Sequence, residues 1–190
     1  MASGFWSPLS IAIGDGPTLT AAAAATCLPV TAKYTFPPNS VGQGTALRIS
    51  AAGRASCVIT TPGTARLDIR LGGTVIYDTG ALPMNTVAKT TVPWKFDALI
   101  VCRAIGTSGN FFGFASLLSE ALLGGLPSAS GDSSIYLSAV SGGADTAPAV
   151  SGSVDLTVAN TFDCFFTQTV ATGQFIVHNF VMESGSVALA

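Results

Sequence analysis

Short apolar runs separated by turn-forming residues dominate this sequence and restrict the fold it can adopt. The runs are rich in Val, Ile, Thr and Phe, and clusters of Gly, Pro, Asn or Ser separate them at short intervals. Such residues favour extended strands, because their branched or aromatic side chains pack well on a pleated surface. Repeated short strands with turn signals between them are typical of a β-sandwich or a β-barrel. The sequence therefore predicts an all-β fold with almost no helix.

The clearest pair of strands lies at residues 65–77. Over residues 65–71, aliphatic residues alternate with Arg66, Asp68 and Arg70, so one face is expected in a core and the other carries charges of both signs. Gly72 and Gly73 follow, and residues 74–77 form the next apolar run. A two-residue glycine connection is a strong hairpin signal, because the primed turns require positive φ. We predict an antiparallel hairpin with a compensated row of charges on its outer face.

About ten strands are expected in one antiparallel, jelly-roll-like β-sandwich. Besides the hairpin, the predicted strands are residues 45–51, 55–60, 95–105, 111–123, 135–140, 154–159, 162–170 and 174–182. Both faces of 95–105 are largely apolar, which places this strand at the centre of a sheet or in an interface. The second half of 111–123 also fits a short helix, and its periodicity alone leaves this alternative open. The surrounding pattern favours a strand.

The N-terminal segment, residues 1–30, differs in character from the rest. It combines Trp6, several Gly and Pro residues and an alanine run, so we expect an extended arm or docking segment before a sandwich domain at 31–190. A signal peptide is not expected, because no basic residue precedes Lys33. A terminal apolar stretch stays disordered unless something binds it. The arm residues expected to contact a partner are Phe5, Trp6, Leu9 and Ile11.

Charged residues make up only 9% of the 190 residues, against roughly 25% in an average soluble domain. Eight basic and ten acidic residues give a formal net charge of −2. Scattered basic residues do not form the patch that nucleic-acid binding requires. No apolar run reaches the roughly 18 residues of a membrane span. Much of the surface must be neutral, and such a surface is best tolerated where another protein covers it.

The cysteines predict no metal or cofactor site. Cys27, Cys57, Cys102 and Cys164 lie far apart in apolar, strand-like segments, and the chain has a single histidine. Zinc sites need closely spaced Cys and His pairs, which this sequence does not contain. Calcium binding through Asp132 and Asp145 is disfavoured, because neither loop has a dense set of oxygen ligands. We expect buried free thiols in a protein made in a reducing cytosol.

One enzyme motif is present at residues 75–81. Asp78, Thr79 and Gly80 occupy the positions of the Asp-Thr-Gly loop of retroviral-type aspartic proteases, in which two carboxylates share one proton. These proteases also carry a later apolar-apolar-Gly segment, for which the sequence offers no convincing match. Asp-Thr-Gly is also an ordinary turn after a strand. The turn is the favoured interpretation, and the protease is the alternative.

His178 is the only histidine, so any catalytic triad would depend on it. It has the same strand parity as Ile176 and Phe180, which favours a histidine on an apolar face or at an interface. The Gly-x-Ser-x-Gly nucleophile elbow is absent from the sequence. We therefore expect a protein without catalytic residues.

The middle of the chain contains an ordered series of motifs. The hairpin of residues 67–77 runs into Thr-Gly-Ala-Leu, and Asn85-Thr86, Val92-Pro93-Trp94 and Arg103-x-Ile-Gly106 follow. This series, within residues 45–115, resembles a group of tailed-bacteriophage virion structural proteins. The resemblance implies a jelly-roll-like sandwich that decorates a capsid as a cement protein and assembles as a homotrimer. It also implies the major capsid protein as partner and the capsid surface as location, after synthesis in the bacterial cytoplasm.

The two-sided apolar strands add candidate contacts for self-association and shell binding. These candidates are Leu99, Val101, His178 and Phe180. Two alternatives stay open: a tail or head–tail connector component, and a virion-displayed module that binds host glycans through exposed aromatic residues. The loops 124–134 and 142–152 contain no Trp or Tyr, which disfavours the glycan module.

Overall fold

The predicted hairpin forms around Gly72 and Gly73. In the computed structural model, β5 (Thr64–Leu71) and β6 (Thr74–Asp78) pair antiparallel. Gly72 and Gly73 have φ values of 58° and 89°, in the left-handed region that glycine tolerates. The structure describes residues 6–58, 63–122, 134–139, 149–171 and 173–185.

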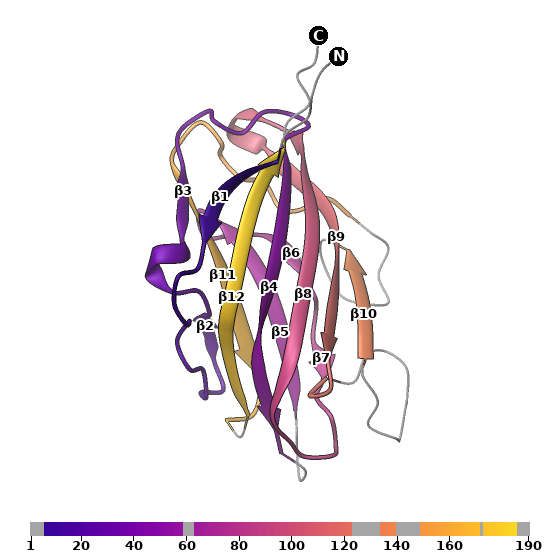
Figure 1. Ribbon diagram of the computed structural model, residues 1–190. Coiled ribbons are helices and arrows are strands. Elements are labelled where there is room, and N and C mark those ends of the chain that lie inside the picture. The colour runs from indigo at the N-terminus through magenta and orange to yellow at the C-terminus, as the bar shows by residue number, and fades with distance from the viewer. Residues whose placement is uncertain (1–5, 59–62, 123–133, 140–148, 172, 186–190) are drawn as a thin grey trace.

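Two antiparallel sheets pack against each other, which confirms the all-β sandwich (Figure 1). Sheet A has the order β1-β12-β4-β8-β9-β10, and sheet B has the order β2-β11-β5-β6, with β3 also on β11 and β7 on β5. The remaining strands are β1 (Ser7–Ile11), β2 (Ala24–Thr26), β3 (Tyr34–Phe36), β4 (Ala46–Cys57), β7 (Leu82–Pro83), β8 (Lys89–Ala104), β9 (Asn110–Ser119), β10 (Ser134–Ala139), β11 (Asn160–Gln168) and β12 (Gln174–Gly185). Helical structure in the described residues is limited to two single 3₁₀ turns.

The chain folds as one long two-stranded ribbon with the Gly72–Gly73 turn at its closed end. Along the ribbon, β1 pairs with β12, β2 and β3 with β11, β4 with β8, and β5 with β6. Successive pairs alternate between sheet A and sheet B. This is the strand order of a jelly roll. β9 and β10, which come between β8 and β11 in the chain, extend sheet A beyond this framework.

Several strands differ in extent from their predictions. Residues 45–51 and 55–60 were expected as two strands, but β4 is one strand of 12 residues, because Ala52 and Gly53 continue the ladder. The helical alternative within 111–123 is wrong, since β9 is a strand to Ser119. Residues 154–159 form a turn with one isolated bridge at Val154.

A side-chain cap accounts for that turn. The Asn160 side-chain amide donates to the backbone carbonyls of Asp155 and Val158, at 2.7 and 2.9 Å. The Asp155 carboxylate accepts from the backbone and the hydroxyl of Thr157. These local bonds offer the backbone an alternative to a sheet ladder, which an apolar pattern alone does not indicate.

The N-terminal segment runs along the edge of sheet A instead of projecting from it as an arm. β1 pairs with β12, and the backbone N–H groups of Ala12, Gly16 and Leu19 donate to β12 carbonyls. β2 then crosses to sheet B. These contacts satisfy backbone groups on the edge of β12 that would otherwise stay unpaired. Residues 7–26 are therefore part of the sandwich.

Three stacked aromatic rings connect the two sheets. Trp94 of β8 stacks on Phe175 of β12 with ring centres 4.5 Å apart, and Phe175 stacks on Phe166 of β11 at 3.9 Å. The indole N–H of Trp94 donates to the carbonyl of Ile176 at 3.1 Å. A Cβ at Gly53 would lie 1.9 Å from that same carbonyl oxygen, so this position accepts only glycine. The stack is the centre of the core at this end of the sandwich.

We predict that Phe175→Ala lowers the free energy of unfolding by about 3–5 kcal/mol, because it removes the middle ring of the stack and leaves a cavity. Phe114→Ala is the matched control. Phe114 is an exposed ring in the same sheet, so its loss should change stability by less than about 0.5 kcal/mol. Urea unfolding of both variants tests the pair, and equal destabilisation would contradict this description of the core.

All four cysteines are free and buried, as predicted. Burial raises the pKa of each thiol, most strongly for Cys27 and Cys164, which lie on paired segments of sheet B. The thiolate is the reactive form, so a raised pKa and limited access both slow modification.

We predict that the folded protein reacts slowly with a thiol reagent such as DTNB at mildly alkaline pH, and that urea exposes all four thiols to it. Absorbance at the endpoint counts the modified thiols. Rapid reaction of two or more thiols in the native protein would contradict the observed burial.

Candidate docking surface on sheet A

The outer face of sheet A carries a cluster of exposed apolar side chains. Leu99 of β8 lies directly opposite Phe114 of β9, and Val101 lies opposite Phe112. The exposed fractions of Leu99 and Phe114 are 48% and 53%. The rings of Phe112 and Phe114 meet edge to face with centres 5.3 Å apart. We name these four residues the Leu99–Phe114 patch.

The patch follows from strands that are apolar on both faces. In β8 the inward residues are Trp94, Phe96, Ala98, Ile100 and Cys102, and in β9 they are Phe111, Gly113, Ala115 and Leu117. Side chains alternate along a strand, so Leu99, Val101, Phe112 and Phe114 must point away from this core. Exposed aromatic and aliphatic groups that cluster in this way mark interaction sites more often than single exposed apolar residues do.

Basic side chains lie beside the patch. The Arg103 guanidinium lies over the Phe112 ring, 4.8 Å from its centre. Arg48, opposite Leu99 on the other side, pairs with Glu183 at 3.6 Å. A shallow groove of about 440 Å³ crosses β4, β8 and β9 at Leu99 and Phe114, and Arg48 and Asp97 also line it. The surface thus combines an apolar centre with flanking arginines, of which Arg48 is paired with a carboxylate and Arg103 lies over an aromatic ring.

The outer face of sheet B has the opposite character. Arg66 pairs with Asp78, Arg70 with Asp68, and Lys33 with Asp163. The first two pairs involve Arg66, Asp68 and Arg70, and they confirm the compensated charge row predicted for residues 65–71. The hydrogen bond from Arg70 to the Asp68 carboxylate raises the pKa of the guanidinium, and Arg70 also stacks over Phe165 at 3.9 Å. Charges on this face therefore neutralise one another.

The Asp-Thr-Gly segment forms a turn whose polar groups are engaged within the chain. The buried Asp78 carboxylate accepts from the backbone N–H of Gly80 at 2.8 Å and from Arg66 Nε at 2.7 Å. The Thr79 hydroxyl oxygen accepts from the N–H of Leu67, and Gly80 has a φ of 69°. The cap by Asp78 and the positive φ of Gly80 are the two features that the turn interpretation predicts.

We predict that Asp78→Ala lowers the free energy of unfolding by about 1–3 kcal/mol, because a buried backbone N–H and a guanidinium lose their acceptor. Asp15→Ala, at a well exposed carboxylate, should have a smaller effect. Thermal unfolding of the two variants provides the comparison. A stability for Asp78→Ala equal to that of the wild type would argue against a structural role.

His178 and Phe180 do not share a face, so their predicted parity is wrong. A β-bulge between Val177 and Asn179 inserts His178 into β12 and reverses the alternation beyond it. Phe180 is 0% exposed and lies in the core, so it is not a surface contact in this fold. His178 faces outward, with Nδ1 2.8 Å from the Asp15 carboxylate.

The predicted arm residues are dispersed around the β1 edge. The half-buried Trp6 ring lies under the Arg48 guanidinium, 4.0 Å away, and Leu9 packs against the core. Ile11 is 51% exposed. Phe5 lies outside the described residues. Of the predicted contacts, the fold brings only Leu99 and Val101 together in the patch, and sequence analysis missed Phe112 and Phe114 beside them.

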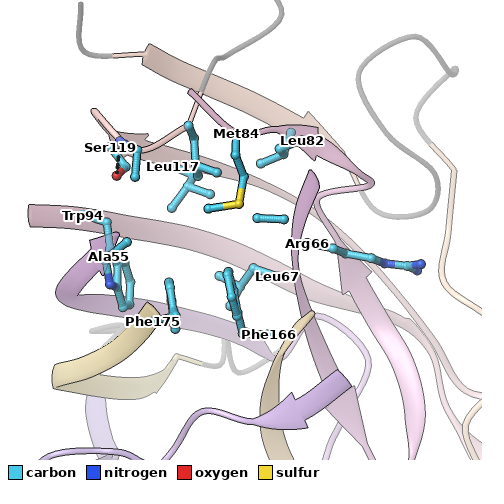
Figure 2. A pocket seen from close by; sticks show the side chains of 13 residues that line it. Ala55, Arg66, Leu67, Leu82, Met84, Trp94, Leu117, Ser119, Phe166 and Phe175 are labelled. Atoms are coloured by element: carbon cyan, nitrogen blue, oxygen red, sulfur yellow. Dashed lines mark hydrogen bonds between the residues drawn. The ribbon is translucent and has the colours of Figure 1, made fainter. Parts of the chain in front are cut away.

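The space between the sheets beside the aromatic stack is too small for a ligand. Figure 2 shows Trp94, Phe175 and Phe166 lining it together with Met84 and Leu82. Its free volume of about 10 Å³ corresponds to no more than one water molecule. It is a packing gap in the core.

In the part of the chain that the structure describes, no three His, Cys, Asp or Glu side chains gather closely enough to hold a metal ion. In the same residues, no helix has the length and apolar character needed to cross a membrane. In comparisons with known proteins, no family model matches the chain, and no curated protein or solved structure matches it significantly.

Proposed function

We propose that this protein is a non-enzymatic structural protein of a tailed-phage virion, a decoration or cement protein that binds the outer surface of the capsid. The observation that supports this proposal best is the exposed Leu99–Phe114 patch on a rigid jelly-roll sandwich. The resemblance of residues 45–115 to virion structural proteins is the reason for proposing a phage particle as the location. The major capsid protein is the proposed partner.

The proposed mechanism is clamping. Burial of apolar surface contributes about 25 cal/mol per Å², so covering the exposed Leu and Phe side chains of the patch favours attachment. The patch lies on paired, central strands, which lose little conformational freedom on binding. A copy that touches two shell subunits adds contact area between them and resists their separation.

Homotrimer formation belongs to the same proposal. Ile11 of β1 lies opposite Val181 of β12 on the outer face, and Ile176 lies farther along β12. These apolar residues lie on β1 and β12, and β4 separates them from the patch on β8 and β9. A neighbouring copy against β1 and β12 therefore leaves the patch free for the shell. Light scattering should give the mass of a trimer at micromolar concentration, and a monomer would contradict this part of the proposal.

We predict that phage particles lacking this protein lose integrity at lower temperature or osmotic stress than complete particles, while host adsorption stays unchanged. The clamp adds contacts within the shell and none to the host. DNA release on heating and adsorption to cells measure the two properties. Intact stability with lost adsorption would instead favour host recognition, and failed head–tail joining would favour a connector.

A further inference from the structure

We propose that the Leu99–Phe114 patch docks onto a protein surface that is apolar at its centre and bears unpaired carboxylates around it, and that this surface belongs to the capsid shell. This inference rests on the proposed function and adds the docking face and the chemistry of its partner. Its basis is the distribution of charge over the two faces.

The outer face of sheet A carries an excess of positive charge. The basic residues on its strands are Arg48, Arg54, Lys89, Lys95 and Arg103, and the acidic residues are Asp97 and Glu183. Two further carboxylates contact these strands, since Glu120 pairs with Lys89 and Asp15 contacts His178, so five positive and four negative charges leave +1. Glu183 pairs with Arg48 and Asp97 with Lys95. Within the described ranges, Arg54 and Arg103 take part in no ion pair, and Arg103 lies on the patch itself.

Arginine beside an aromatic ring is a favourable arrangement for an interface. The guanidinium of Arg103 covers the Phe112 ring and keeps its hydrogen-bond donors free of carboxylates from the described residues. Arg and Phe are enriched at protein interfaces, and a guanidinium binds a carboxylate through two parallel hydrogen bonds. A carboxylate of the partner would complete this site.

A second copy of this chain is poorly suited as that partner. Of the eight carboxylates that the structure describes, six lie in ion pairs with Lys or Arg, and a seventh, Asp15, lies 2.8 Å from Nδ1 of His178. The eighth, Asp155, accepts hydrogen bonds from Thr157. Two sheet A faces packed together would also bring like charges into contact, which disfavours the pairing. Among the described residues, the chain thus offers no carboxylate free of a partner, which favours a different protein as the source of the unpaired carboxylates.

The outer face of sheet B fits the solvent-facing side of the attached protein. Its three basic and three acidic residues are paired with one another. Such a face has no unpaired charge to direct toward a partner. The attached protein is thus oriented with the Leu99–Phe114 patch toward the shell and the outer face of sheet B toward solvent.

The test uses shells from a phage that lacks this gene, together with the purified full-length protein, and measures co-sedimentation over a range of NaCl concentrations. We expect Phe114→Ser to weaken binding about tenfold or more, as loss of a central interface residue does. Arg103→Gln should weaken binding several-fold and reduce its dependence on salt. Amidation of shell carboxylates with a carbodiimide and an amine should also weaken binding of the wild-type protein.

Two control variants change similar properties elsewhere. Val158→Ser removes a half-exposed apolar side chain from the turn before β11, and Ser153→Glu lowers the net charge by the same one unit as Arg103→Gln. Both controls should bind like the wild type. All four substitutions are at exposed positions, so thermal unfolding should show that each variant keeps the fold.

The outcomes separate this inference from the proposed function. Binding of the wild type that Phe114→Ser and Arg103→Gln leave unchanged would overturn the docking face and leave the proposed function standing. Equal binding to amidated shells would overturn the carboxylate chemistry. A wild-type protein that does not bind the shells at all would overturn the proposed function and this inference with it.

Discussion

Alternation of side chains along β8 and β9 determines both what the sandwich buries and what it leaves on its surface. Each strand presents apolar residues on both sides, but the sandwich has only one core between its sheets. The inward set joins that core, with Trp94 in the stack that connects the sheets. Of the outward set, Leu99 and Phe114 stay about half exposed. The exposed patch is thus a direct consequence of how the core is filled.

The few charged residues are arranged differently on the outer faces of the two sheets. The charged side chains on the outer face of sheet B pair with one another, so this face needs no partner protein to neutralise its charges. Sheet A carries Arg54 and Arg103, which form no ion pair with the described residues, and Arg103 lies over the Phe112 ring next to the exposed Phe114. The low charge content indicates a surface that another protein covers, and in the folded molecule this surface corresponds to the outer face of sheet A. The two outer faces differ in chemistry, which is what a protein that attaches to a larger surface in one orientation requires.

Sequence patterns predicted the parts of the fold that depend on local chemistry. The Gly72–Gly73 turn, the alternating β5 strand and the two-sided β8 strand all follow from residues within each segment. Very short strands such as β2 and β3 were missed, because three residues carry no clear pattern and form only by pairing with β11. These strands depend on tertiary contacts.

The candidate site shows the same division. Leu99 and Val101 were predicted from the apolar outer side of their strand. Phe112 and Phe114 were not, because both sides of β9 are apolar and the sequence does not indicate which side faces the core. The position of Phe180 was wrong for a different reason. The bulge at His178 reverses the inward–outward alternation of side chains along β12, and no residue type in the sequence predicts this bulge.

The central claim is that the outer face of sheet A is the attachment face. A cryo-electron microscopy map of the phage particle at a resolution that separates the two sheets tests it most directly. Copies are expected on the head, with β8 and β9 against the shell and β5 and β11 toward solvent. Copies at the tail or at a single vertex, or copies with sheet A facing outward, would contradict it.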